Sequence, residues 1–390
     1  MTTCFLHTAD WQLGKPFASV ADEAKRHRLR QERVEAIRRM ASLVERTSPD
    51  FVVVAGDLFD SPHVTKSTVS AACGAIGGLK VPVFVIPGNH DHGGPGSLWE
   101  QEFFLREQRQ LAPNLQVLLE AKPKVLDSAI LFPAPLLRRH ESGNPIAWVR
   151  SALDDPELPA DLPRIVLAHG TIQGFGSLPA DEDESAPANW IDLSSLPLDE
   201  MDYVALGDWH GTQQVLPQAW YSGTPEIDRF PKGESNDPGH VLHVTVSRGE
   251  PPQVEKVPTG KLIWRKHAFH FSDDDDLERL THDLESLVGT QVDDHLLQLS
   301  LTGMLGMGAS DRLEKMLESW EARLVRLKLD SQVITAPSAA EIDQLTLRLE
   351  DPLVAAVARQ LVNRAEGDDE DAAIARLALR ELHAALLAVA

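Results

Sequence analysis

Cysteine is scarce in this sequence, because Cys4 and Cys73 are the only two among 390 residues and neither belongs to a C-x-x-C pair. A small disulfide scaffold is therefore excluded, and reduced thiols in a cytoplasmic protein are the simplest interpretation. No apolar run reaches the roughly 18 residues that a membrane span needs, so no membrane association is expected. Met1–Leu13 lack a basic segment and a long apolar stretch, so no export signal is expected either.

Positive charge is also in short supply. Lys and Arg total 37 against 59 Asp and Glu, which gives a net charge of −22. This negative charge repels the phosphate backbone and disfavours strong non-specific binding of nucleic acid by the chain as a whole. A role on nucleic acid would therefore need a local basic surface, metal ions or a partner. The apolar fraction of 43% and the length are otherwise ordinary for a globular protein of two or three domains.

The first part of the chain alternates short apolar strands with helices, which favours an α/β layered fold. Residues 51–55, FVVVA, are typical of a buried strand because they are rich in β-branched side chains. Further strands are expected at 3–7, 81–86, 129–132, 164–168 and 203–206, and helices at 24–46 and 67–77.

A turn-rich segment, Pro231–Gly239, then marks a change of composition. Beyond it, strands at 240–246, 254–257 and 295–301 and helices at 277–288 and 311–319 indicate a small α+β domain. From Ala339 onward the pattern is helical and charged.

The strand ends of the first part carry residues that ligate metals. They are Asp10, Asp57, the group Asn89, His90 and Asp91, then His169, and finally Asp208 and His210. In open α/β sheets, ligands collect at the carboxyl ends of the strands. A mixed Asp, Asn and His cluster at that edge is what a two-metal hydrolase needs, and its oxygen and imidazole donors suit manganese, magnesium, iron or zinc.

In this order, the motifs resemble the calcineurin-like metallophosphoesterase superfamily, with its pattern D-x-H, GD, GNHD, a lone His and G-H-x-H. Within it, Phe5–Trp11 and Tyr221–Glu226 resemble the SbcD-type DNA repair exonuclease family. The resemblance implies a four-layer sandwich of two sheets flanked by helices, a smaller α+β capping domain and C-terminal helices. The implied divisions are 1–235 for the nuclease domain, 236–335 for the capping domain and 336–390 for the helical segment.

Carried onto this sequence, the resemblance implies that Asp57 bridges two divalent ions, of which manganese is the first choice. Asp10, Gln12 and His210 would complete the first ion site, and Asn89, His169 and Asp208 the second. His90 would act at the scissile phosphate, oriented by Asp91. Two positions depart from the pattern: Gln12 stands where the family has His, and Asp208 replaces the first His of the last motif. The amide of Gln12 is a weaker donor to a transition metal than imidazole, whereas Asp208 suits a hard ion.

The function implied is a divalent-metal-dependent DNA phosphodiesterase, an exonuclease or endonuclease of DNA repair or recombination. Family members work with an SbcC-like coiled-coil ATPase and often as homodimers, and residues 339–390 are candidates for docking that ATPase. Two alternatives stay open: a phosphodiesterase or phosphatase acting on a small nucleotide, and a catalytically degenerate subunit that binds metal without turnover.

Overall fold

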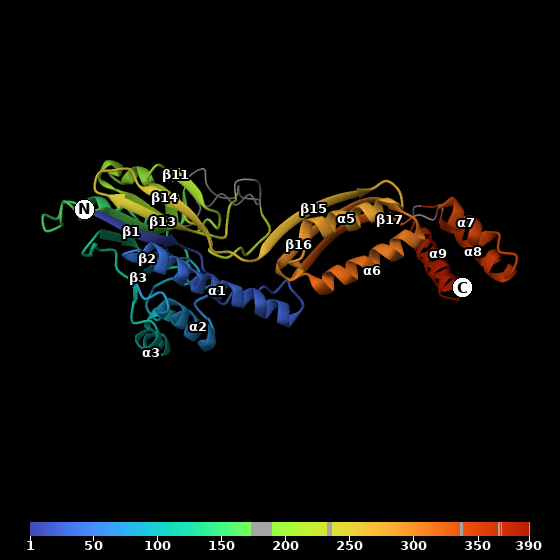
Figure 1. Cartoon of the computed structure of the whole chain (residues 1–390), viewed down its shortest axis with the longest axis horizontal. Coiled ribbons are helices and arrows are strands. Elements are labelled where there is room, and N and C mark those ends of the chain that lie inside the picture. The colour runs from blue at the N-terminus through green and yellow to red at the C-terminus, as the bar shows by residue number, and fades with distance from the viewer. Residues whose placement is uncertain (173–188, 232–235, 336–337, 366, 368, 390) are drawn as a thin grey trace. The chain divides into compact units, whose positions relative to one another are not determined.

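The structure, a computed structural model, describes residues 1–172, 189–231, 236–335, 338–365, 367 and 369–389 (Figure 1). The chain divides into two compact units, Met1–Leu262 and Ile263–Ala390. Within the described residues, none of the helices combines the length and the apolar composition needed to cross a bilayer.

The first unit contains a six-stranded sheet in the order β14-β13-β1-β2-β3-β4. Its parallel part is β1 (Thr2–Thr8), β2 (Phe51–Ala55), β3 (Val83–Ile86) and β4 (Leu115–Val117). The edge beside β1 is extended by two antiparallel strands, β13 (His240–Ser247) and β14 (Gln253–Pro258). Every residue of β2 and β3 is buried, as expected for strands with both faces covered.

A second six-stranded sheet has the order β11-β12-β10-β7-β6-β5. Its strands are β5 (Lys124–Val125), β6 (Ile130–Ala134), β7 (Arg164–His169), β10 (Tyr203–Gly207), β11 (Gln213–Leu216) and β12 (Ala219–Tyr221). Strands β6, β7, β10 and β12 run parallel. A short ribbon joins β8 (Thr171–Ile172) to β9 (Trp190–Ile191).

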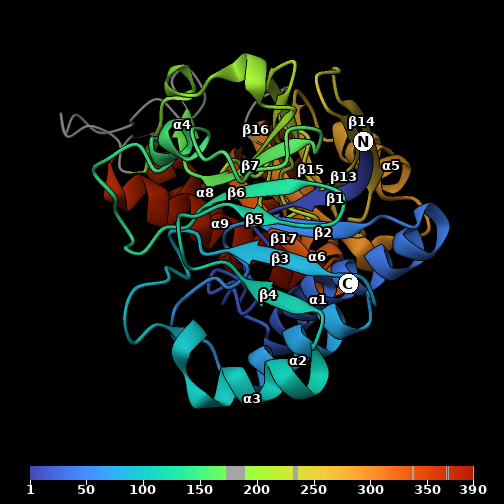
Figure 2. The same ribbon diagram turned by 90° about the vertical axis from the view of Figure 1, so that its left-hand side faces the viewer.

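The two sheets pack face to face, and helices cover their outer faces (Figure 2). Aromatic side chains fill the space between the sheets, with Phe5 and Phe51 of the first sheet in one cluster with Leu167 and Tyr203 of the second. The first sheet is covered by α1 (Glu23–Thr47), α2 (Lys66–Gly77) and α3 (Glu102–Leu111), and the second by α4 (Trp148–Ala152) and short 3₁₀ helices at Leu193–Ser195 and Leu198–Glu200. The predicted four-layer sandwich is confirmed.

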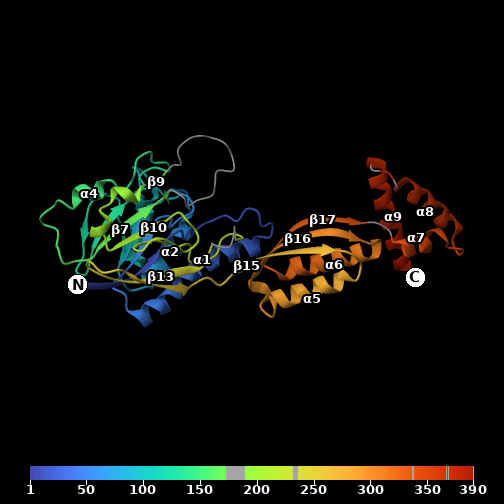
Figure 3. The same cartoon turned by 90° about the horizontal axis from the view of Figure 1, so that it is seen from above.

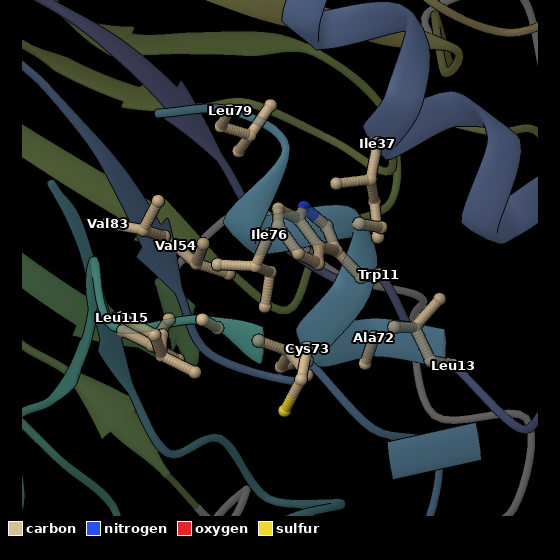
Figure 4. Packing of buried hydrophobic residues seen from close by; sticks show 14 of the residues in the cluster. Trp11, Leu13, Ile37, Val54, Ala72, Cys73, Ile76, Leu79, Val83 and Leu115 are labelled. Atoms are coloured by element: carbon tan, nitrogen blue, oxygen red, sulfur yellow. The ribbon is translucent and has the colours of Figure 1, made fainter. Parts of the chain in front are cut away.

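The core under α1 and α2 ties the first sheet to its helices (Figure 4). Ile37 of α1 and Ile76 of α2 pack with Val54 of β2, and Trp11 belongs to the same buried cluster. Helix α1 begins after Asp22, whose side chain accepts the Lys25 amide N–H, and α2 begins after Thr65 in the same way. Because Trp11 belongs to this buried cluster, the loop that carries Asp10 and Gln12 is anchored in the core.

The second unit is a parallel βαβαβ arrangement. It runs β15 (Ile263–Phe271), α5 (Asp276–Val288), β16 (His295–Leu305), α6 (Met307–Arg323) and β17 (Arg326–Thr335), with a 3₁₀ turn at Val292–Asp294. Both helices lie on one face of this sheet (Figure 3). Helices α7 (Ala339–Thr346), α8 (Pro352–Ala365) and α9 (Glu370–Val389) follow, and Leu345, Ala358 and Leu379 pack on Met307.

The units divide between Leu262 and Ile263 and not at residue 235, and residues 232–235 of the expected linker lie outside the described residues. Strands β13 and β14, expected in the capping domain, pair beside β1 in the first sheet. The reason is that an alternating pattern shows that a strand has one buried face but does not show which sheet covers it. The sheet of the second unit is built instead from β15 and β17, which flank β16.

Candidate active site

Five strand ends from the two sheets meet at one edge of the sandwich. Asp10 follows β1, Asp57 follows β2, Asn89 follows β3, His169 ends β7 and Asp208 follows β10. The ligand atoms of Asp10, Asp57 and His169 lie within 4.8 Å of one another, and all three side chains are buried. The convergence predicted from the strand ends is therefore present for these three residues.

The loops that carry these side chains have unusual backbone geometry. Positive φ angles occur at Asp10 (55°), Gln12 (41°), Asp57 (55°) and Asp208 (102°). Such conformations cost of the order of 1–3 kcal/mol each for non-glycine residues and cluster at functional sites. Cross-loop hydrogen bonds hold them in place, from the Asp10 N–H to the Gly56 carbonyl and from the Gln12 N–H to the Asp57 carbonyl. The two loops therefore fix each other.

Two glycines allow the side chains to approach so closely. Gly56 has φ of +90°, and a Cβ at this position would overlap the imidazole of His169. A Cβ at Gly88 would overlap the carboxylate of Asp57. Only a residue without a side chain fits at either place, which explains the glycines of the GD and GNHD motifs.

Two buried donor atoms at this edge fit a cation. The Nδ1 of His169 lies 2.8 Å from the Ala55 carbonyl, which leaves Nε2 at 3.6 Å from Asp57 Oδ1 and 3.9 Å from Asp208 Oδ1. Among the described residues, this Nε2 and the buried Oδ1 of Asn89 have no hydrogen-bond partner. An imidazole held by a carbonyl through one nitrogen, with the other nitrogen open toward carboxylates, is the usual arrangement of a metal-ligating histidine.

The electrostatics of the cluster lead to the same conclusion. Burial opposes the charged form of His169, but the carboxylates of Asp57, Asp10 and Asp208 outweigh it and raise the pKa of His169 to about 9. Burial raises the pKa of Asp10 to about 6, although His210 and His169 act against that rise. The buried carboxylates therefore draw in positive charge, which a divalent cation can supply in place of protons.

His90 lies at the rim of the cluster. Its Nδ1 is 2.8 Å from the Asp60 carbonyl, its Nε2 is 3.9 Å from Asp57 Oδ2, and its side chain is 35% exposed. The structure corrects the role expected of Asp91, because the Asp60 carbonyl and not this carboxylate orients the His90 ring. Asp91 is fully buried and accepts the N–H groups of Phe59 and Gly88. It therefore holds the two ligand loops together.

His210 and Gln12 contact each other on the side of Asp57 that carries Oδ2, whereas His169 faces Oδ1. The Nδ1 of His210 lies 3.1 Å from Asp228 Oδ2. The amide nitrogen of Gln12 lies 3.3 Å from His210 Nε2 and 3.5 Å from Asp57 Oδ2. The Gln12 oxygen, expected to ligate a metal, instead accepts a 2.6 Å hydrogen bond from Lys15 Nζ. The expected ligand atom of Gln12 is thus turned away from the cluster.

Sequence reasoning missed several residues that build this site. Asp228 is buried and contacts both His210 and Lys15. Arg33 is buried on α1 and donates to the carbonyls of Asp10 and Trp11. A signal for Arg33 was present in the sequence, because it lies four residues from both Leu29 and Ile37 and therefore on the buried face of the helix. The signal for Asp228 was only its nearness to the Tyr221–Glu226 run.

Taken together, Asp10, Asp57 and His169, with Asn89 and Asp208 beside them, offer carboxylate, amide and imidazole donors that fit a divalent metal ion. These donor types do not distinguish between manganese, magnesium, iron and zinc as the bound ion.

Comparisons with known proteins concern the same part of the chain. The model of the family described as calcineurin-like phosphoesterase matches residues 5–212. A Bacillus subtilis (strain 168) protein named uncharacterized metallophosphoesterase YhaO is 25% identical over 288 residues, which cover 68% of this chain and 62% of that protein. This chain therefore spans less than two thirds of the length of that relative. Among solved structures, TT1561 of Thermus thermophilus has a TM-score of 0.38 at 14% identity, and the match covers 66% of this chain and 100% of that one.

The family match includes all of the strand-end residues described above, from Asp10 to His210, and extends over more than half of the chain. The chain belongs to the calcineurin-like phosphoesterase family, whose members are hydrolases that use divalent metal ions.

Proposed function

We propose that this protein is a divalent-metal-dependent phosphodiesterase that cleaves DNA, the nuclease subunit of an SbcD-type system in repair or recombination. The observation that carries the proposal is the convergence of Asp10, Asp57 and His169 within 4.8 Å, all buried, at the strand ends of two facing sheets. A cation held there by these residues, with Asn89 and Asp208, would supply Lewis-acid stabilisation of negative charge on a phosphodiester.

His90 is the residue that we assign to the leaving group. The Asp60 carbonyl fixes its Nδ1, so that Nε2 faces the carboxylate of Asp57 at the edge of the cluster. Its partial exposure lets a phosphodiester reach it. A protonated imidazole in this position donates its proton to the departing oxygen, which is general acid catalysis worth typically 10²–10⁴-fold in rate.

The choice of DNA as substrate rests on the resemblance of two runs to the SbcD-type family. One run, Phe5–Trp11, leads into the ligand Asp10. The other, Tyr221–Glu226, is tied to the same loop because the Thr224 hydroxyl donates to the Asp10 carbonyl at 3.0 Å. The two runs are therefore in contact next to Asp10, although they are far apart in the sequence.

A net charge of −22 also supports a partner that supplies much of the grip on DNA. We propose an SbcC-like coiled-coil ATPase for this role, docked on the C-terminal helices, with homodimers formed through the phosphoesterase domain. Leu347, Leu349 and Leu353, at and between the ends of α7 and α8, expose 67%, 93% and 74% of their surface, and we propose that these neighbouring apolar side chains belong to the docking surface.

A nuclease assay in manganese on single- and double-stranded DNA tests the proposal. The wild type should cleave DNA, His90→Ala should be at least about 100-fold slower, and the matched control His140→Ala, which replaces an exposed histidine of the same unit, should retain full activity. Equal rates for all three proteins would contradict the catalytic role of His90. Hydrolysis of a cyclic nucleotide without cleavage of DNA would instead favour an enzyme that acts on small nucleotides.

A further inference from the structure

The amide of Gln12 is held in one orientation by its neighbours. Lys15 Nζ, a donor only, lies 2.6 Å from one end of the amide, so that end must be the oxygen. The other end, Nε2, then points at the carboxylate of Asp57 and at the ring of His210. Turning the amide over would place its NH₂ group against an ammonium group and its oxygen near a carboxylate.

Lys15 is itself fixed in place. Its ammonium group lies 2.8 Å from Asp228 Oδ2 and 3.8 Å from Asp60 Oδ1, and its side chain is only 22% exposed. The Asp228 side chain is 1% exposed, and the charges of His210, Lys15 and Arg229 hold its pKa well below the ordinary value despite its burial. This ion pair is partly shielded from water and therefore holds the position of the ammonium group.

The ring of His210 is engaged on both nitrogens. Nδ1 faces Asp228 at 3.1 Å, and Nε2 faces the Gln12 amide nitrogen at 3.3 Å. Arg229 Nη2 also lies 2.8 Å and 3.2 Å from the two ring nitrogens. The His210 and Gln12 atoms expected in the first ion site therefore already have donors beside them, and the positive charges of Lys15 and Arg229 stand next to them.

The donors on the other side of Asp57 differ in this respect. The Nε2 of His169 and the Oδ1 of Asn89 are buried and, among the described residues, without a hydrogen-bond partner. The two sides of one carboxylate are thus unequal, since one side has open ligand atoms and the other has an amide N–H group and nearby cations.

We propose that this chain binds a single divalent cation, among Asp10, Asp57 and His169, and that the NH₂ group of Gln12, oriented by Lys15, takes the place of the second ion of the pair expected from the sequence. This inference rests on the metal dependence proposed above and not on DNA as the substrate. Gln12 and Lys15 are positioning residues that set the number of ions.

The number of ions can be measured without an activity assay. We would dialyse the protein against excess MnCl₂, count manganese per chain by elemental analysis, and record the electron paramagnetic resonance spectrum. The wild type should hold one manganese per chain with the spectrum of an isolated ion. The double variant Gln12→His/Lys15→Met, which replaces the amide by imidazole and removes the ammonium group, should hold two, with the spectrum of a coupled pair.

Lys122→Met is the matched control, because Lys122 is an exposed lysine of the same unit that pairs with the exposed Glu120, and it should leave the count at one. Two manganese ions in the wild type would overturn the inference and leave the metal-dependent phosphodiesterase proposal intact. No bound manganese in the wild type would overturn both. One ion in the double variant, folded as judged by circular dichroism, would refute the role given to Gln12 and Lys15.

Discussion

Replacing Arg33 with Met tests how the ligand loops are held. Arg33 is 2% exposed and donates from Nε to the Trp11 carbonyl at 2.7 Å and from Nη2 to the Asp10 carbonyl at 2.9 Å. It also donates to the Thr224 hydroxyl at 3.1 Å and to the Glu226 carbonyl at 3.2 Å. One guanidinium group therefore joins the loop after β1 to the Tyr221–Glu226 run.

The size of the effect follows from these partners. Hydrogen bonds to a charged group contribute about 1.5–3 kcal/mol each, but bonds within one network are not additive. Three of the acceptors are backbone carbonyls that no substitution removes. Arg33→Met takes the guanidinium donor away from the Trp11 carbonyl and leaves the Asp10 and Glu226 carbonyls with the Thr224 hydroxyl as donor. We expect the free energy of unfolding to fall by about 1–3 kcal/mol, the usual cost of leaving a buried hydrogen-bonding group without its partner.

Urea denaturation followed by tryptophan fluorescence measures this loss. Arg30→Met is the control, because Arg30 lies on the same helix but pairs with the exposed Glu23, and it should leave the unfolding midpoint almost unchanged. We also expect weaker binding of manganese by Arg33→Met, since the Asp10 loop loses its anchor. Equal midpoints for the two variants would refute the claim that Arg33 holds the ligand loops.

Two further predictions concern other parts of the same unit. Gly88→Ala should abolish manganese binding, because its Cβ would overlap the Asp57 carboxylate, and titration calorimetry that finds the wild-type affinity would contradict this geometry. Burial raises the pKa of Glu226 to about 7 from its ordinary value of 4.5, although the Lys261 and Leu262 amides and Arg39 act in the opposite direction. The folded state therefore binds the Glu226 proton more tightly than the unfolded state, and the stability that this proton contributes is lost as the pH rises from about 4.5 to 7. Glu226→Gln, which does not titrate, should gain stability relative to wild type between pH 5 and pH 7.5 in urea denaturation, and a constant difference would refute the assignment.

Some of the strands that were predicted, such as β2 and β3, have both faces buried. The expected strand at 51–55 coincides with β2, and the helix expected at 24–46 differs from α1 by one residue at each end. Strand β15 was missed because Arg265 and Lys266 interrupt its apolar pattern where the sheet face is exposed. Charged residues are compatible with the open face of a strand, but in β15 two of them stand side by side and break the alternation that indicates a strand.

In the site, residue types and strand order determine which positions come together, whereas neighbouring side chains determine how each side chain is oriented. The strand-end positions of Asp10, Asp57 and His169 were predictable because parallel strands bring their carboxyl ends to one edge. The orientation of the Gln12 amide was not predictable, because it depends on Lys15, whose ammonium group is placed by Asp228 from a distant part of the chain. The prediction that Asp91 orients His90 was wrong for a similar reason, because the Nδ1 of His90 contacts the Asp60 carbonyl, which lies in another loop.

The distribution of fixed charge explains why the two sides of Asp57 behave differently. Lys15 and Arg229 both pair with Asp228, and Arg229 also contacts His210, so the carboxylate on that side is already paired within the protein. On the opposite side, the carboxylates of Asp57 and Asp10 raise the pKa of His169 to about 9 despite its burial, which means that this region takes up a proton when no other cation is supplied. A divalent ion that binds there must displace that proton, so manganese affinity should rise with pH toward 9 and should do so less steeply in His169→Gln. Manganese binding that is independent of pH in the wild type would show that His169 is not a ligand.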